Sequence, residues 1–548
     1  MRKILTFIAG TIFTGTLFAG GLVTNTNQSA LYTRLQSRNA STSIDAVYFN
    51  PAGLTKLGTG FFASINNQTI GQTKTVKNDY LYLSGSPKEY IGKVSAPIFP
   101  GVYVAYNIGN FSFSGGLNPI GGGGGAKYAT GLPSFEMQIA DLIPLLNSKS
   151  IPTTAYSADI FFEGTSVYMG YQINAAYKIN DMLSIGAGVR MVTAKNTYLG
   201  HMTDISINPN YPAFGATYNG SSMVPANEFF TAGATTLNGL ATAATGYSAV
   251  IGGRLAASVP PGTLLSDGPT NGLNGTEIGT IQQLMGAAGQ TPAQIGAASI
   301  GYAQAVLNGA APVFTANATA MTGYSAATSD IEVDASQKGT GYSPILSVNF
   351  SPSEQLNIAV KYEFQTKLEL TTSVVDNKGA GIFIDGETSI ADMPAMLATG
   401  IEYKPMDKLL LSGSMNVYFD NNVDYDGSAT ENVNMIAKNF TEYAFGAEYA
   451  VTDQLRASAG WLGTFTGVNS NYQNDQRYSL NTNSFGAGVG YRVNDMIDVN
   501  LGGQYTFYKE GTKAFNRILG PTTAVPIIET YNKNTWVVAI GVDLYFGK

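Results

Sequence analysis

The chain contains no cysteine and a single histidine, His201, among its 548 residues. The absence of cysteine excludes disulfides and thiolate sites, and one histidine leaves no nucleophile–base–orienter set for covalent catalysis. We therefore expect no enzyme, no metal site and no cofactor. Charged residues make up only 12% of the chain, about half the share that a soluble protein carries. Much of the outer surface is thus expected to face something other than water.

Long hydrophobic runs are also absent beyond the first twenty residues, so no membrane-spanning helix is expected there. Arg2 and Lys3 precede the apolar stretch 4–18, a pattern that predicts a secretory signal peptide over residues 1–19. An uncleaved anchor helix is the alternative, although the stretch is short for one. The net charge of −7 provides no basic footprint, so no nucleic acid is expected as a partner.

The feature that recurs instead is an alternating run of apolar and polar residues, a tight polar turn, and a second alternating run. Copies of this unit centre on 177–183, 449–455 and 491–497. Such alternation is typical of strands with one apolar face. We predict fourteen strands, at 58–71, 99–108, 110–119, 163–178, 182–200, 329–350, 354–374, 388–404, 407–424, 437–451, 453–467, 481–493, 495–509 and 534–546.

The connections between these strands alternate between short and long. Every second link is only a few residues, such as 351–354, and the others run from about a dozen residues to over a hundred. An even strand number with this parity places all tight turns and both chain termini on one side, as in bacterial outer-membrane barrels. The predicted fold class is all-β: a 14-stranded antiparallel transmembrane β-barrel over residues 58–548, in the outer membrane of a Gram-negative-type bacterium.

The two-residue repeat also predicts which side chains face lipid. In the last strand the lipid row comprises Trp536, Val538, Ile540, Val542, Leu544 and Phe546. In the strand at 354–374 the same rule places four charged side chains in the lumen, namely Lys361, Glu363, Lys367 and Glu369. It places four apolar side chains on the lipid side, namely Tyr362, Phe364, Leu368 and Leu370.

The long loop at 201–328 is poor in charge and rich in Ala, Gly and Thr. Helical spacing of apolar residues predicts one helix from Thr276 and a second over 293–307. Two interpretations are compatible with each other: extracellular helices that pack over the barrel mouth, and an apolar groove that collects a hydrophobic solute.

The third strand breaks its own pattern. After a regular alternation it continues with Gly115, Gly116, Asn118 and Pro119. Proline lacks a ladder donor and glycine has no side chain to hold the wall, so a kink or bulge is expected here. The alternative is that the strand simply ends early at a glycine loop. A kink would leave backbone groups unpaired and open a slot in the wall.

Late in the roughly forty residues before the barrel, Ala46-Val47-Tyr48-Phe49 leads into Asn50-Pro51-Ala52-Gly53. This order of signal peptide, pre-barrel segment and fourteen strands resembles the FadL/TodX family of outer-membrane transporters of long-chain fatty acids and other hydrophobic compounds. Two later stretches, 455–461 and 475–491, are similar to the last strands of that family. The resemblance covers essentially the whole mature chain, but the large loop at 201–328 departs from it.

The resemblance implies a passive mechanism, in which extracellular loops capture a hydrophobic ligand that leaves sideways through the kinked third strand. It implies that residues 20–57 form a hatch inside the barrel, with Phe49, Asn50, Pro51 and Ala52 beside that kink. The kink itself would consist of Gly115, Gly116, Asn118 and Pro119. The family also uses basic residues toward a carboxylate, for which alternation offers three lumen-facing candidates: Arg190, Lys361 and Lys367.

We expect a monomer whose partners are outer-membrane lipid, lipopolysaccharide and a hydrophobic small molecule. Two alternatives share the barrel. A polar-solute porin would lack the luminal hatch and the kinked strand. A surface adhesin or binding barrel would use the long loop at 201–328 as its functional part.

Overall fold

The structure, a computed structural model, describes residues 24–378, 381, 383–423, 435–520 and 523–547. The predicted signal peptide at 1–19 lies outside the described residues. The chain divides into two compact units. The barrel unit comprises the described residues up to 138, 160–202 and those from 331 onward, and the helical unit comprises 139–159 and 203–330.

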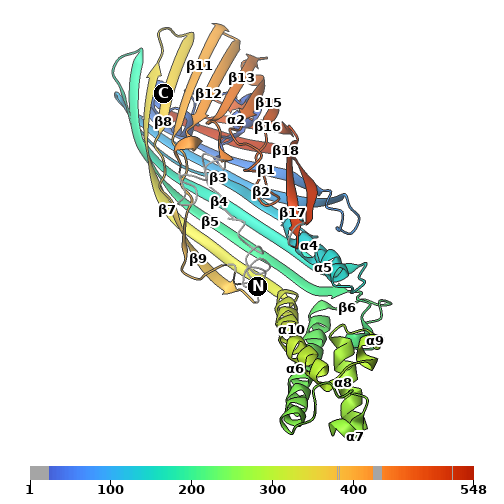
Figure 1. Cartoon of the computed structure of the whole chain (residues 1–548). Helices are drawn as coiled ribbons and strands as arrows, with labels where there is room; N and C mark the ends of the chain where they lie inside the picture. Colours follow the sequence, from blue (N-terminus) through green and yellow to red (C-terminus); the bar gives the residue numbers. More distant parts are fainter. Residues whose placement is uncertain (1–23, 379–380, 382, 424–434, 521–522, 548) are drawn as a thin grey trace. The chain divides into compact units, whose positions relative to one another are not determined.

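The wall of the barrel unit is a closed antiparallel barrel of 14 strands (Figure 1). It closes where β1 pairs with β18, from Gly60 opposite Gly547 to Asn78 opposite Glu529. β8 and β9 are two segments of one interrupted wall strand, and so are β10 and β11. The described strands are β1 (Gly60–Asn78), β2 (Lys88–Ile108), β3 (Phe111–Tyr128), β4 (Tyr156–Lys178), β5 (Leu183–Ile207), β6 (Val224–Pro225), β7 (Ile331–Phe350), β8 (Leu356–Glu363), β9 (Glu369–Asp376), β10 (Thr388–Ile390), β11 (Met396–Met406), β12 (Leu409–Tyr418), β13 (Phe440–Ala450), β14 (Leu455–Phe465), β15 (Thr482–Asn494), β16 (Ile497–Tyr508), β17 (Gly511–Leu519) and β18 (Thr523–Gly547).

The predicted strand order and the alternation of short and long connections are confirmed. In the tight turn between β4 and β5, for example, the N–H of Ile179 donates to the carbonyl of Leu183 at 2.9 Å. Several strands are longer than predicted: β2 begins at Lys88 and β18 at Thr523, and β1, β3, β4 and β5 also extend further at their long-loop ends. The first part of β18 pairs with β17, a strand that the sequence analysis placed in a loop.

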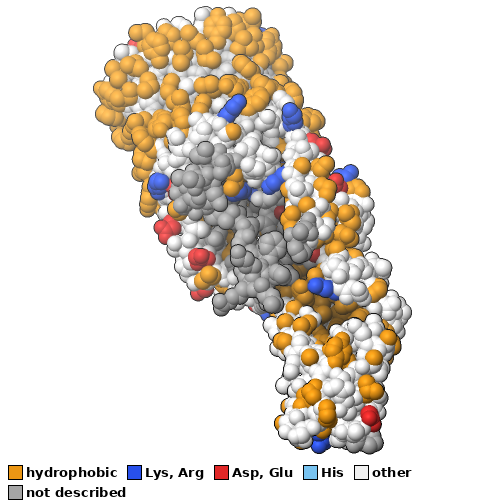
Figure 2. Space-filling view, in the orientation of Figure 1, with side chains coloured by type: hydrophobic (Ala, Val, Ile, Leu, Met, Phe, Trp, Pro, Cys, Tyr) orange, Lys and Arg blue, Asp and Glu red, His pale blue; other side chains and the backbone are white. Residues whose placement is uncertain are grey.

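The outer wall of the barrel is apolar, as predicted. Trp536, Val538, Ile540 and Phe546 of β18 are each about half exposed, in spite of their hydrophobicity. Figure 2 shows hydrophobic side chains gathered in a broad band over the barrel strands. Such a surface is stable only against lipid, and it places the barrel in a membrane. Among the described helices, none has both the length and the apolar character needed to cross a membrane.

The predicted facing of the strand at 354–374 is correct up to Phe364 and wrong from Lys367 onward. Leu368 and Leu370 are buried, with exposures of 1% and 2%, whereas Lys367 and Glu369 are exposed. The cause is a one-residue slip: β7 pairs Ile345 with Glu363 of β8, and then Lys338 with Thr371 of β9. Because side chains alternate with period two, one extra residue turns every later side chain to the other face.

The helical unit contains α5 (Leu142–Ser148), η2 (Pro212–Phe214), α6 (Ala226–Ala256), α7 (Gly268–Asn271), α8 (Gly275–Ala287), α9 (Pro292–Gly296) and α10 (Ile300–Ala327). It has its own apolar core, in which α6, α8 and α10 contribute Ile251, Ile281 and Leu307. The helix predicted from Thr276 corresponds to α8. The one predicted over 293–307 is divided between α9 and α10, and α6 was missed because its Ala, Gly and Thr content gives little apolar periodicity. Two further short helices are α4 (Pro133–Ala140) and η3 (Asp420–Asn422).

The apolar wall yields a first prediction. Replacing Ile540, in the middle of the lipid row of β18, by Arg would place a charge in the hydrocarbon region. We expect it to lower the free energy of unfolding from liposomes by about 2–4 kcal/mol, measured by urea titration. Ile540→Leu serves as the control and should leave the midpoint unchanged. Equal midpoints for both variants would show that this face does not contact lipid.

Candidate functional site

Residues 24–57, here called the hatch, fill the lumen of the barrel. They form α2 (Ala30–Leu35), α3 (Ala46–Phe49) and the 3-10 helix η1 (Pro51–Lys56). Ser29 caps α2, because its Oγ accepts the N–H of Tyr32 at 3.0 Å, and Pro51 opens η1 at a position where its missing donor costs nothing. Almost every hatch side chain from Gln28 to Leu54 is buried.

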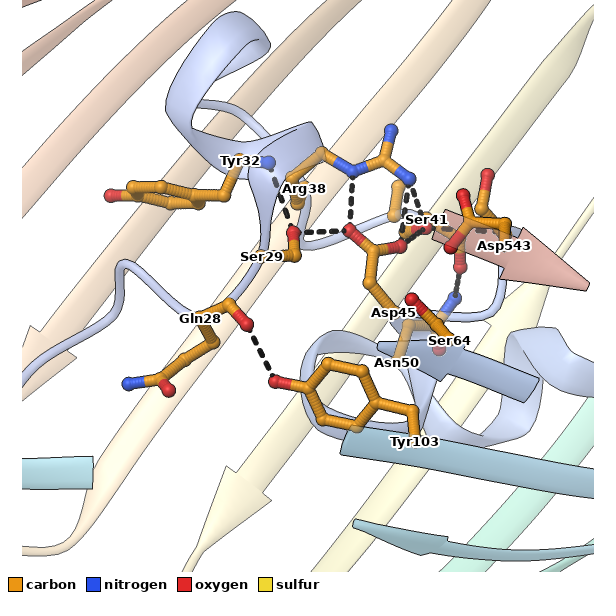
Figure 3. A network of polar contacts seen from close by, with 12 residues as sticks. Gln28, Ser29, Tyr32, Arg38, Ser41, Asp45, Asn50, Ser64, Tyr103 and Asp543 are labelled. Carbon is orange, nitrogen blue, oxygen red and sulfur yellow. Dashed lines mark hydrogen bonds and ion pairs between the residues drawn. The ribbon is translucent and has the colours of Figure 1, made fainter. Parts of the chain in front are cut away.

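A buried ion pair holds the centre of the hatch (Figure 3). The Asp45 carboxylate accepts Arg38 Nη2 at 2.8 Å and Nε at 3.0 Å, and also the hydroxyls of Ser41 and Ser29 at 2.7 and 3.0 Å. Burial by itself would raise the pKa of Asp45. The Arg38 guanidinium and the two hydroxyls outweigh burial, so the pKa of Asp45 lies below its ordinary value.

The Asn50-Pro51-Ala52 stretch anchors the hatch to the wall. Asn50 Nδ2 donates to Asn349 Oδ1 of β7 at 2.7 Å, and the N–H of Ala52 donates to Ser347 Oγ at 3.0 Å. The predicted neighbour Phe49 is buried and its ring stacks on Tyr32 at a centroid distance of 5.6 Å. Thus η1 lies against both β3 and β7, but the hydrogen bonds of Asn50 and Ala52 to the wall run to β7.

The pairing between β2 and β3 is interrupted. The two strands pair from Ile108–Phe111 up to Val102–Leu117, and again only at Lys93–Lys127 and Gly92–Tyr128. We call the unpaired stretch, 94–101 of β2 opposite 118–126 of β3, the β2–β3 gap. On its other side β3 stays paired with β4, with register shifts after Pro119 and after Gly121.

Side chains around the gap explain why the strands separate there. Asn118, Pro119 and Ile120 are buried one after another, so β3 has left the alternating pattern and turned inward. A Cβ on Gly116 would lie 3.0 Å from Tyr103 and 3.2 Å from Val47 of the hatch, whereas one on Gly115 would have no neighbour nearer than 3.6 Å. A side chain at 116 would therefore crowd Tyr103 and Val47, whereas one at 115 would make only ordinary contacts.

The β2 side of this gap was not predicted from the sequence. Pro97 and Pro100 stand in β2 opposite the inward turn, and neither has an N–H to offer to β3. The signal was present: two prolines within a run that otherwise alternates. It was overlooked because the strand was predicted to begin at residue 99, which left Pro97 in a loop.

The first residues of the hatch occupy the place that β2 has vacated. The N–H of Asn25 donates to the carbonyl of Ile120 at 2.8 Å, and Thr24 forms an antiparallel bridge with Gly121. Gln28 Nε2 donates to the carbonyl of Pro119 at 3.0 Å while its Oε1 accepts Asn118 Nδ2 at 2.6 Å. Nothing local in the sequence pointed to Gln28, because its role depends on a partner ninety residues away.

The main chain of Gln28 also contacts β2. Its carbonyl accepts the hydroxyl of Tyr103 at 2.7 Å, a bond drawn in Figure 3. Gln28 therefore contacts β3 at the gap, through Asn118, and β2 just beyond the end of the gap, through Tyr103. These bonds, which seal the gap, all run between neutral groups.

Two of the predicted carboxylate-binding residues lie together in the lumen. Arg190 Nη1 donates to Glu363 at 2.6 Å, and Lys361 Nζ donates to the same carboxylate at 2.6 Å and to the carbonyl of Tyr48 at 2.7 Å. Both cations lie over the Tyr48 ring, at 4.8 and 4.4 Å from its centroid. In this arrangement they clamp the hatch, and Glu363 balances part of their charge.

The third candidate, Lys367, does not join them. Its side chain is 77% exposed and pairs with Asp392 at 2.8 Å. It follows the register slip between β8 and β9, so it faces away from the lumen. The prediction that Lys367 faces the lumen is therefore wrong.

A cavity of about 430 Å³ lies at the tight-turn end of the barrel, between the end of the hatch and the turns. Its walls include charged side chains of the hatch and of the turns, among them Lys56, Asp181, Glu354 and Lys404. Such walls suit water and ions. Within the described residues no group of three His, Asp or Glu side chains is placed to hold a metal ion.

The Arg38–Asp45 pair predicts an acid-sensitive hatch. A lowered carboxyl pKa contributes stability above the ordinary value of 3.8 and loses it as pH falls through the folded-state pKa. We expect hydrogen exchange of amides 29–45, corrected for intrinsic rate, to be constant above that pH and faster below it.

Asp45→Asn should abolish this pH dependence and lower the free energy of unfolding by about 3–5 kcal/mol, because it leaves Arg38 buried with only the more distant Glu402. Asp181→Asn, at the exposed Lys178–Asp181 pair, is the control and should leave both unchanged. A wild-type profile that stays flat below pH 3.8 would contradict the role given to the pair.

Comparison with known proteins shows which solved structures share this fold. No family model and no curated protein matches the sequence. The structure is similar to that of a Pseudomonas aeruginosa FadL homologue, with a TM-score of 0.55 and 14% identity over 96% of this chain and 100% of that chain. It is also similar to a TodX deltaS2S3 mutant, a monoaromatic hydrocarbon channel, with a TM-score of 0.50 and 11% identity over 96% of this chain and 100% of that chain. With its lipid-facing wall and its filled lumen, the chain has the FadL/TodX fold of an outer-membrane β-barrel.

Proposed function

We propose that this protein carries hydrophobic compounds across the outer membrane and releases them sideways into the bilayer through the β2–β3 gap. The observation that carries the proposal is that β2 and β3 are unpaired over 94–101 and 118–126, where residues of the hatch take the place of the missing partner. The similar structures of a FadL homologue and of a monoaromatic hydrocarbon channel support the same class of cargo.

The physical chemistry of the cargo favours a sideways exit. Each buried CH₂ group gains about 0.8 kcal/mol on leaving water, so a hydrophobic molecule would climb in free energy on entering the aqueous periplasm. It would not do so on passing from an apolar lumen into lipid. No energy source is required beyond a concentration gradient and a seal that moves.

The hydrogen bonds that residues 24–28 make at the β2–β3 gap, here called the seal, can break without disrupting the rest of the hatch. Its bonds at Asn25, Gln28 and Tyr103 join neutral groups, each worth about 0.5–1.5 kcal/mol net. The rest of the hatch is held by buried ion pairs and by the anchors to β7. We infer that opening displaces residues 24–28 while the hatch from Ala30 onward stays in place.

A polar-solute porin fits the barrel less well. The lumen is filled by the hatch, and the Arg190–Lys361–Glu363 cluster is buried rather than arranged around a water-filled constriction. We further propose that the barrel works as a monomer in contact with outer-membrane lipid and lipopolysaccharide.

A disulfide across the seal tests the proposal, and the native chain offers no competing cysteine. Thr24 and Gly121 are antiparallel bridge partners, so Thr24→Cys with Gly121→Cys places two thiols within disulfide range. We expect oxidation to reduce uptake of a hydrophobic dye into proteoliposomes by about tenfold or more, because the open state can no longer be populated, and reductant to restore it.

The matched control is Phe113→Cys with Ala175→Cys, which cross-links β3 to β4 at a pair that is already bonded. This variant should transport equally well when oxidised and reduced. Full uptake by the oxidised double variant at positions 24 and 121 would show that cargo does not pass the β2–β3 gap.

A further inference from the structure

The barrel wall is interrupted at a second place, between β8–β9 and β10–β11. The ladder is incomplete between Glu363 and Glu369 of one wall strand and between Ile390 and Met396 of the other. The Thr366–Met393 bridge and one further backbone hydrogen bond, from the N–H of Ala391 to the carbonyl of Leu368 at 2.8 Å, span this stretch. On the side of β7 that faces β8 and β9, the described register is also broken between Lys338 and Ile345. We call this region, 364–370 with 391–395, the dent.

One carboxylate organises the dent. Asp392 Oδ1 accepts the N–H of Leu368 at 2.8 Å, and Oδ2 accepts Gln365 Nε2 at 3.0 Å and the Lys367 ammonium at 2.8 Å. The side chain of Asp392 is 4% exposed. A charged acceptor thus replaces the backbone carbonyl that a regular ladder would have offered to Leu368, and makes a stronger bond.

The dent has a defined consequence for the lumen. Some buried residues near the dent are polar, namely Lys361 and Glu363 of β8 and Gln337 of β7. Because the extra residue reverses the alternation, the dent instead turns apolar side chains inward: Leu368, Leu370, Ala391 and Met393, each between 1% and 5% exposed. They belong to the same apolar cluster as the hatch rings and as Ile120 at the β2–β3 gap.

The neighbouring strand is adapted to this arrangement. A Cβ on Gly339 would lie 2.2 Å from the carbonyl oxygen of Glu369, and one on Gly341 would lie 2.4 Å from that of Lys367. Only glycine permits the chain to approach β7 so closely. Along the wall, Tyr168, Val192 and Ala194 continue the apolar cluster from the dent side toward β3.

We infer that Leu368 and Met393 determine which hydrophobic molecules the lumen accepts, and that Asp392 is the positioning residue that holds them there. The inference rests on the proposed function. Its physical basis is that a wall strand gives up part of its ladder and buries a carboxylate while it turns apolar side chains toward the lumen. A hydrophobic cargo moving toward the β2–β3 gap meets these side chains on the opposite part of the same apolar cluster.

The test compares uptake of a homologous series of alkylbenzenes, from short to long chains, into proteoliposomes. Leu368→Ala and Met393→Ala each remove several carbon atoms from the wall. We expect the ratio of uptake rates for the longest and shortest compounds to rise by about tenfold, the scale of discrimination that a change of pocket size of this order produces. Asp392→Ala should move the ratio in the same direction, because Leu368 and its neighbours lose their fixed position.

Two controls separate selectivity from stability. Leu346→Ala trims a leucine that faces outward from β7 and is 52% exposed, so the ratio should not change. Lys367→Gln removes the exposed partner of Asp392 but leaves the bond to Leu368, and it should also keep the wild-type ratio. Folded Leu368→Ala, Met393→Ala and Asp392→Ala proteins that all retain the wild-type ratio would overturn the inference. Absence of alkylbenzene uptake by the wild-type protein would instead overturn the proposed function.

Discussion

The requirement that every backbone group in a lipid-facing wall be hydrogen-bonded governs where this barrel can open. An unpaired N–H or C=O in the hydrocarbon region costs several kcal/mol, so a closed barrel normally has no weak line along its wall. At the β2–β3 gap and at the dent this wall departs from regular pairing over several residues, and each departure is repaired differently. At the β2–β3 gap the repair comes from the hatch, a separate segment that can move. At the dent it comes from Asp392, which belongs to the wall itself.

Because the two places are repaired differently, one is suited to opening and the other to staying in place. A seal made of neutral hydrogen bonds at Asn25 and Gln28 can be released at modest cost, which suits a gate. A buried carboxylate that accepts an ammonium and a backbone N–H is costly to separate from them, which suits a fixed surface. The ion pairs within the hatch and the Arg190–Lys361–Glu363 cluster likewise fix what should stay in place. The buried ion pairs thus lie in the parts of the hatch and of the wall that we propose to stay fixed.

Much of the barrel could be predicted because its signals are local. Alternation with period two and the composition of the turns are read over about ten residues, and they were sufficient for the strand order, the parity of the connections and the lipid row of β18. Pro119 and its neighbouring glycines marked the inward turn of β3 for the same reason. The failures lie where geometry depends on distant parts of the chain. One extra residue after Glu363 reversed the facing of Lys367. This extra residue is recognisable only from how β8 and β9 pair with β7, a strand that lies elsewhere in the sequence.

The functional residues follow the same division. Arg190 and Lys361 were placed in the lumen correctly by alternation, but their engagement with Glu363 and Tyr48 depends on the hatch entering the barrel. Gln28 and Asp392 carry no motif, since each acts through partners that only the folded barrel brings near.

The most direct test of lateral release is to follow the cargo itself. A hydrophobic alkyl diazirine can be photolysed during uptake into proteoliposomes, and its adducts mapped by mass spectrometry. The account predicts adducts on β2 at 94–101 and on β3 at 118–126, the two sides of the gap. Adducts confined to the tight turns at 179–182 and 351–355, at the end of the barrel that faces the polar cavity, would contradict it.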